Sequence, residues 1–187
     1  MKRSSIIWIV IGSLVLITIF SVVGSYNGLV SSGTTVENKF SQIDVDLQRR
    51  ADLIPNLVTT VKGYAAHEKA VIKSIADARS NLVGARTPAE KSQANGELTG
   101  ALSKLLVIVE NYPNLKADTQ FSKLMDELAG SENRISVARR DYNEAVTTYN
   151  VKIRRFPTSI LASSFGFDKR DFFKGTEGSN QVPDVKF

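Results

Sequence analysis

The residues of this chain that could perform chemistry are few and widely spaced. The sequence has one histidine, His67, and no cysteine, which excludes disulfides, thiolate metal sites and a cysteine nucleophile. Glu68 follows His67 directly, and neighbouring residues on a helix project about 100° apart. The two side chains therefore do not form a metal-binding or acid–base pair, and we interpret His67 as an ordinary helix residue.

The carboxylates show no catalytic arrangement either. Asp44 and Asp46 diverge on a helix, whereas Asp141 and Glu144 share a face but lie beside Arg140, which is typical of an ion-pair network. The sequence contains no G-x-S-x-G nucleophile elbow and no G-x-x-x-x-G-K-[ST] phosphate loop. It therefore predicts a protein that is not an enzyme, without catalytic, cofactor-binding or metal-binding residues and without a cofactor.

Three charged residues, Arg50, Glu68 and Lys152, interrupt stripes that are otherwise mostly apolar. A charge that is buried without a partner is costly. Each of the three is therefore expected to pair with a group on another helix or to lie where its stripe opens to water. We interpret them as candidate structural polar positions, and an acid paired with Arg50 or Lys152 would fix the register between helices.

The stripes themselves predict three long helices that must cover one another, as in coiled coils. Residues 40–82 carry apolar positions at every seventh residue, so we expect a long helix there. Pro55 is expected to kink it and Gly63 is a second weak point, so the alternative is two helical segments. Its two stripes contain Phe40, Leu47, Ile54, Val61, Glu68, Ile75 and Leu82, and Ile43, Arg50, Leu57, Tyr64, Val71 and Ala78.

The second and third helices are predicted over residues 88–111 and 118–155. Thr87 followed by Pro88 is typical of a helix start, and Pro157 ends the third helix. Residues 105–109, with the sequence LLVIV, are apolar nearly all round, so we expect them to be buried on more than one side.

Residues 6–23 form an uncharged run of 18 residues, IIWIVIGSLVLITIFSVV. At about 1.5 Å per residue the run would span roughly 27 Å, which is close to the hydrocarbon thickness of a bilayer. The alternative is a cleaved signal peptide, but the run is longer than the usual apolar region of about 7–15 residues and no A-x-A-like site follows. We therefore predict a retained, single-pass transmembrane helix with Trp8 as an interfacial anchor.

Basic residues around this run predict its orientation. Lys2 and Arg3 precede it, and the next basic residue is Lys39. The positive-inside rule then leaves the N-terminus in the cytoplasm. We expect a protein of the cytoplasmic membrane with its helical bundle on the extracytoplasmic side.

The chain is thus expected to have five segments. They are a short basic N-terminus (1–5), a transmembrane helix (6–23), a juxtamembrane segment (24–33), a helical-bundle domain (34–174) and a flexible C-terminal tail (175–187). Thr34 or Thr35 is expected to cap the first helix of the bundle.

The end of the chain is rich in aromatic residues and lacks a helical period. Phe165, Phe167, Phe172 and Phe173 either cap the apolar end of the bundle or form a docking segment for a partner or the membrane. The formal charge of +5 is spread along the chain, mostly as pairs such as Arg154-Arg155, so we expect no nucleic-acid partner.

Several motifs resemble the LemA family, in order and over nearly the whole chain. They are YNGLV (26–30), VENKFSQIDVDLQRRADLIPNLVTTVKGYAAHE (36–68), ADAR (76–79), YPNLKAD (112–118), ENRISVARRDYNEAV (132–146), TTYN (147–150), FP (156–157), and FGF and FF near the end. The resemblance implies a bacterial, single-pass membrane protein with an antiparallel helical bundle, here up-and-down with three long helices and short C-terminal elements. It implies no defined biochemical activity and no catalytic residues.

Together these observations predict a membrane-anchored, non-enzymatic helical bundle that acts as an interaction or scaffold module. Its expected partners are the lipid bilayer and an unidentified protein, for which a second copy of the chain is one candidate. The alternative is a membrane-tethered sensor or small-ligand-binding bundle, in which Arg50, Glu68, Tyr64 and Tyr142 would line a polar gap between helices.

Overall fold

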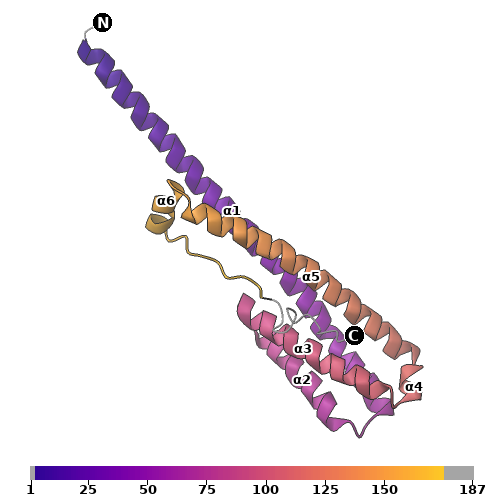
Figure 1. Ribbon diagram of the computed structural model, residues 1–187. Helices are drawn as coiled ribbons and strands as arrows, with labels where there is room; N and C mark the ends of the chain where they lie inside the picture. Colours follow the sequence, from indigo (N-terminus) through magenta and orange to yellow (C-terminus); the bar gives the residue numbers. More distant parts are fainter. Residues whose placement is uncertain (1–2, 175–187) are drawn as a thin grey trace, which may run out of the picture. The chain divides into compact units, whose positions relative to one another are not determined.

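The computed structural model describes the backbone of residues 3–174 and the side chains of residues 8–174 (Figure 1). Its helices are α1 (Arg3–Tyr64), α2 (Lys69–Gly84), α3 (Pro88–Val109), α4 (Pro113–Lys116), α5 (Thr119–Arg154) and α6 (Thr158–Phe165). The predicted all-α class is confirmed, since no strand occurs in these residues. The antiparallel bundle stays a prediction, and the predicted tail, residues 175–187, lies outside the described residues.

The chain divides into two compact units. The first consists of Met1–Asn38 and Glu144–Arg170, and the second of Lys39–Asn143 and Asp171–Phe187. α1 and α5 each contribute one segment to both units. The predicted domain boundaries, including the single bundle domain over residues 34–174, stay predictions.

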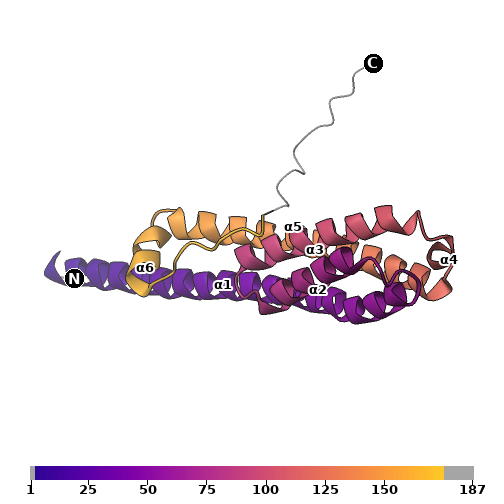
Figure 2. The same ribbon diagram turned by 90° about the horizontal axis from the view of Figure 1, so that it is seen from below.

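In the first unit, the surroundings of α1 change along its length. All residues from Trp8 to Gly24 are exposed, whereas Leu29 is fully buried. Figures 1 and 2 show α6 beside α1, and α1 continuing past α6 toward its N-terminal end without a neighbouring helix. This uncovered stretch coincides with the apolar run of residues 6–23. By length and composition, α1 could therefore cross a membrane, with a mean hydropathy of 2.2 in its apolar window.

The segment after the apolar run is a continuation of α1, and the prediction that Thr34 or Thr35 caps a new helix is wrong. Their hydroxyls donate to the carbonyls four residues back, at 3.0 and 2.9 Å, as in a helix interior. Gly28 and Gly33 lie in this part of α1 and do not break the helix, because side chains of α5 pack against it there. A Cβ on Gly33 would lie 3.7 Å from the ring of Tyr149, so α5 covers this part of α1.

The predicted helix over residues 40–82 is two helices, α1 and α2, in the second unit. α1 runs through Pro55 but ends at Tyr64, one residue after Gly63. The Ala65 N–H donates to the Val61 carbonyl at 2.8 Å, and the chain turns before α2 begins at Lys69. The apolar spacing continues across the turn, because residues of both helices are buried. They include Ile54, Leu57, Val61, Ile75 and Leu82.

A hydrogen bond from α2 compensates for the proline inside α1. Pro55 has no N–H, so the Ala51 carbonyl four residues earlier loses its usual donor. The Arg79 Nε donates to that carbonyl at 2.9 Å, and Ala51 itself is buried. α2 therefore packs against α1 with Arg79 beside the proline site.

The starts of α3 and α5 agree with the sequence. Thr87 accepts the N–H of Glu90 and the Glu90 side chain accepts the N–H of Thr87, which forms a capping box. α5 runs from Thr119 to Arg154, close to its predicted bounds. α6 occupies residues 158–165, where no helix was expected.

The expectation that residues 105–109 are buried on more than one side is wrong. Leu105 and Val109 are buried, but Leu106 and Val107 are exposed, with 47% and 71% of their surfaces accessible. These residues follow the ordinary helical period, in which positions four apart share a face and their neighbours do not. α3 therefore has an apolar strip on its exposed side.

We predict that Arg79→Met lowers the free energy of unfolding by about 1–3 kcal/mol, because it leaves the buried Ala51 carbonyl without a donor. Pro55→Ala restores a backbone N–H, so the cost of Arg79→Met should fall to near zero in that background. The double-mutant cycle consists of the unchanged chain, the two single variants and the double variant. Urea unfolding of each full-length chain in detergent, followed by circular dichroism, gives its free energy of unfolding. Lys73→Met, at an exposed position of α2, is the control. An equal cost of Arg79→Met in both backgrounds would contradict the compensation.

Candidate functional site

Arg50 lies in the core of the second unit, although it is charged. Its surface is only 3% exposed, and its Nη1 donates to the amide oxygen of Asn95 and to the carboxylate of Glu132. The three residues come from α1, α3 and α5. A single guanidinium thus connects three helices, because the apolar stripe of α1 places residue 50 inward.

Burial and the charge of Glu132 act on the pKa of Arg50 in opposite directions, and burial has the larger effect. Burial lowers the pKa of Arg50, and the negative charge of Glu132 raises it again. Arginine keeps its proton in proteins, so the cation is permanent here. Its Nε has no hydrogen-bond partner among the described residues. The arrangement is suited to holding helices in register rather than to proton transfer.

Further polar groups surround Arg50 in the same unit. Arg134 lies 3.5 Å from the carboxylate of the buried Asp46, and it donates to the hydroxyl of the fully buried Ser131 at 3.0 Å. Lys91 lies 2.6 Å from Asp44, in an ion pair whose angles are not those of a hydrogen bond. We call this set the polar layer, and it consists of Asp44, Asp46, Arg50, Lys91, Asn95, Ser131, Glu132 and Arg134.

Glu68 is not inside a helix but immediately precedes α2, in the turn after α1. Its carboxylate accepts the hydroxyl of Tyr112 at 2.8 Å, and a second tyrosine, Tyr64, donates to Asp118 at 2.8 Å. Each carboxylate raises the pKa of the tyrosine that it binds. The pKa of Asp118 is lowered because it accepts the N–H of Phe121 at the start of α5.

Lys152 belongs to the first unit, where its partners are neutral. Its Nζ donates to the Gly28 carbonyl at 2.7 Å and to the Ser32 hydroxyl at 2.9 Å, both on α1. A Cβ on Gly28 would lie only 3.2 Å from this ammonium, so the glycine permits the close approach. Lys152 therefore attaches α5 to α1 just beyond the apolar run.

In the alternative function, a small-ligand-binding bundle, four residues were expected to line one polar gap: Arg50, Glu68, Tyr64 and Tyr142. The structure places them in separate contacts instead. Arg50 binds within the polar layer, and Tyr64 and Glu68 bind Asp118 and Tyr112. Tyr142 is buried and donates to the Asp171 carbonyl at 2.7 Å. Their polar groups are engaged in separate contacts within the unit.

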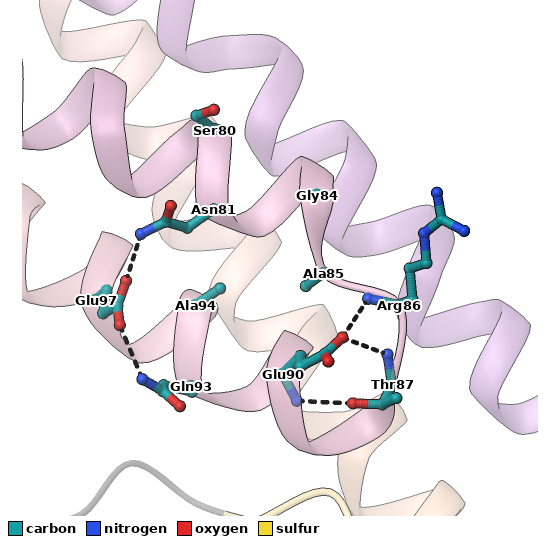
Figure 3. Close-up of a pocket in the computed structure, with 10 residues that line it drawn as sticks. All are labelled: Ser80, Asn81, Gly84, Ala85, Arg86, Thr87, Glu90, Gln93, Ala94 and Glu97. Carbon is teal, nitrogen blue, oxygen red and sulfur yellow. Dashed lines mark hydrogen bonds between the residues drawn. The ribbon is translucent and has the colours of Figure 1, made fainter.

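A shallow hollow of about 660 Å³ lies at the turn between α2 and α3 (Figure 3). Several of its polar side chains bind one another or the backbone. Asn81 and Gln93 donate to Glu97 at 2.9 and 3.1 Å, and Glu90 accepts the N–H groups of Arg86 and Thr87. These contacts stabilise the turn. Among the described residues, no group of three or more acidic or histidine side chains could hold a metal ion.

Replacing Arg50 by methionine should lower the free energy of unfolding by about 1–3 kcal/mol, because it leaves the buried amide oxygen of Asn95 without its donor. Arg49→Met is the matched control, since Arg49 is the preceding residue and is exposed; its effect should stay within about 0.5 kcal/mol. Urea unfolding of the full-length chain in detergent measures both. Equal effects of the two substitutions would contradict a structural role of the buried cation.

Glu90 should make stability depend on pH in the acid range. The N–H groups of Arg86 and Thr87 lower the pKa of Glu90. A carboxyl whose pKa is lower in the folded state adds stability above its unfolded pKa and loses it as the pH falls through its folded pKa. The melting temperature of the chain should therefore exceed that of Glu90→Gln at neutral pH, and the gap should close in acid. A gap that does not change with pH would contradict this linkage.

Comparison with known proteins gives several relatives. The chain is 29% identical to Magnetosome protein MamQ 2 of Paramagnetospirillum magneticum, over 87% of this chain and 72% of that protein. It is 29% identical to Magnetosome protein MamQ of Magnetospirillum gryphiswaldense, over 79% of this chain and 64% of that protein. It is 27% identical to Protein LemA of Metamycoplasma hominis, over 84% and 73% of the two chains.

The family assignment rests on a broader match. The family model described as LemA family matches residues 39–187, which include the whole polar layer, Glu68 and Lys152. The resemblance seen in the motifs is therefore confirmed, and this chain belongs to the LemA family.

Proposed function

We propose that this protein is a membrane-anchored, non-enzymatic interaction or scaffold module. The observation that carries the proposal is the change along α1. Its apolar residues from Trp8 to Gly24 are uncovered, whereas from Leu29 onward the same helix enters a packed core. Lipid is the solvent in which such an apolar surface is stable, so the uncovered stretch is the transmembrane helix.

The continuity of α1 supports a retained anchor rather than a removed signal peptide. Residues on both sides of the apolar run belong to one helix, and Lys152 binds Gly28 and Ser32 just beyond it. The chain crosses the cytoplasmic membrane once. The positions of Lys2, Arg3 and Lys39 in the sequence support an N-terminus in the cytoplasm and packed helices outside it.

The polar contacts of the second unit support a structural role for its buried charges. Arg50 is bound by Asn95 and Glu132, and Glu68 by Tyr112, so these groups tie helices together. The bond from Arg79 to Ala51 supports an antiparallel pairing of α1 and α2 within an up-and-down bundle. The function of the chain then lies in what its surface binds.

The exposed apolar strip of α3 is the surface that we assign to a protein partner. Leu106 and Val107 are exposed side by side on the second unit. The partner is a second copy of the chain or another membrane protein. Two relatives are named magnetosome proteins, which supports a role within a larger cellular assembly.

A photocrosslinking amino acid at Val107 of the full-length chain tests this function in intact bacterial cells. We expect adducts of higher mass that stay in the membrane fraction after an alkaline carbonate wash. The same label at Lys62, an exposed polar position of the second unit, is the control and should give little adduct. Monomer alone at position 107 would contradict the interaction, and adducts in the soluble fraction would contradict the anchor.

A further inference from the structure

We propose that the end of α5 and α6 form a second membrane contact, which docks on the headgroup layer of the membrane that α1 crosses. We call this segment the α6 corner, and it comprises residues 154–167. The inference rests on the proposed anchor and adds a lipid surface as the partner of a specific part of the first unit.

Aromatic contacts position the α6 corner at the end of the apolar run. The ring of Tyr26 meets those of Phe165 and Phe167 edge to face, with centroids 5.2 and 5.7 Å apart. Tyr26 lies three residues after Val23, the last residue of the run, which is about 4.5 Å along a helix axis. Aromatic rings gather at this depth of a bilayer, where hydrocarbon gives way to headgroups.

The α6 corner exposes large apolar side chains instead of burying them. Phe156 is 81% exposed, and Ile160 and Phe165 are each 57% exposed. Each of these side chains leaves more than half of its surface accessible, although water is a poor environment for such a cluster. The other end of the aromatic segment behaves differently. Phe173 is buried in the second unit, so the capping role expected for these rings applies to it and not to Phe165.

The charge of the α6 corner suits anionic headgroups. Residues 154–167 contain two basic residues, Arg154 and Arg155, and no acidic residue. Arg154 and Arg155 are exposed and make no ion pair within residues 8–174, whereas Arg170 pairs with Glu37. Basic residues beside exposed aromatic and aliphatic side chains are typical of segments that lie in a membrane interface.

Hydrogen bonds on both sides attach the α6 corner firmly to α1 and α5. Before it, Lys152 binds Gly28 and Ser32 on α1. After it, Asn150 on α5 exchanges two hydrogen bonds of 2.9 Å with the backbone of Arg170. The fold of the first unit therefore holds the α6 corner beside the end of the apolar run, where its exposed side chains can reach the headgroup layer.

The absence of cysteine allows a direct test with single nitroxide labels. The full-length chain, carrying Phe156→Cys or Ile160→Cys, is reconstituted into vesicles of phosphatidylethanolamine and phosphatidylglycerol. Collision rates with oxygen and with a water-soluble nickel chelate report the depth of each label. Val15→Cys in the apolar run is the lipid reference, and Lys62→Cys, an exposed position of the second unit, is the aqueous reference.

We expect the oxygen-to-nickel ratio at positions 156 and 160 to lie between the two references and severalfold above that of position 62. Replacing both Arg154 and Arg155 by glutamine should lower the ratio at position 160, and uncharged phosphatidylcholine vesicles should have the same effect. Both arginines are exposed, so the fold should tolerate these changes.

Other outcomes would overturn the inference and identify what failed. Labels at positions 156 and 160 that match position 62, with position 15 deep in lipid, would leave the anchor intact and remove the docking. Labels shielded from both reagents would mean that a protein covers the α6 corner instead. A water-accessible label at position 15 would overturn the proposed anchor itself.

Discussion

The constraint on which the rest of this structure depends is that one helix must satisfy two environments. α1 presents apolar side chains on all sides up to Val23 and an apolar stripe with polar faces from Leu29 onward. A helix that is apolar all round needs a surrounding apolar phase, whereas a striped helix needs only neighbours along its stripe. In the first unit α5 supplies the neighbour, as the contact of Tyr149 with Gly33 shows, and in the second unit α2, α3 and α5 contact α1 at Ala51 and Arg50.

Hydrogen bonds and charges then fix how the covering helices pack. Apolar stripes alone allow several registers, because one leucine replaces another at little cost. The buried guanidinium of Arg50 needs acceptors at defined positions, and Asn95 and Glu132 provide them from two different helices. The carbonyl of Ala51 similarly needs one donor, which Arg79 provides. These few polar requirements favour one packing among those that hydrophobic burial would tolerate.

Periodicity predicted the helical class, the bounds of α3 and α5 and the apolar run, because those features are local. It missed the turn between α1 and α2, since the seven-residue spacing continues from Val61 to Ile75 across it. It also missed α6, which has only eight residues and follows Pro157. The partners of Arg50 depend on tertiary packing and carry no local signal. The role of Arg79 did carry a local signal. A proline inside a helix predicts that the carbonyl four residues earlier lacks its usual donor, so the sequence could have been searched for a side chain that replaces it.

The two units divide the properties of the chain between them. The first contains the apolar run, the rings around Tyr26 and the unpaired arginines of the α6 corner, all of which suit lipid. The second contains the polar layer and the exposed strip of α3, which suit packing and protein contact. Substitutions that weaken membrane contact therefore change residues that the second unit does not use for its own stability. In the proposed function, membrane attachment and partner binding therefore depend on separate residues, so that substitutions can change one of them without changing the other.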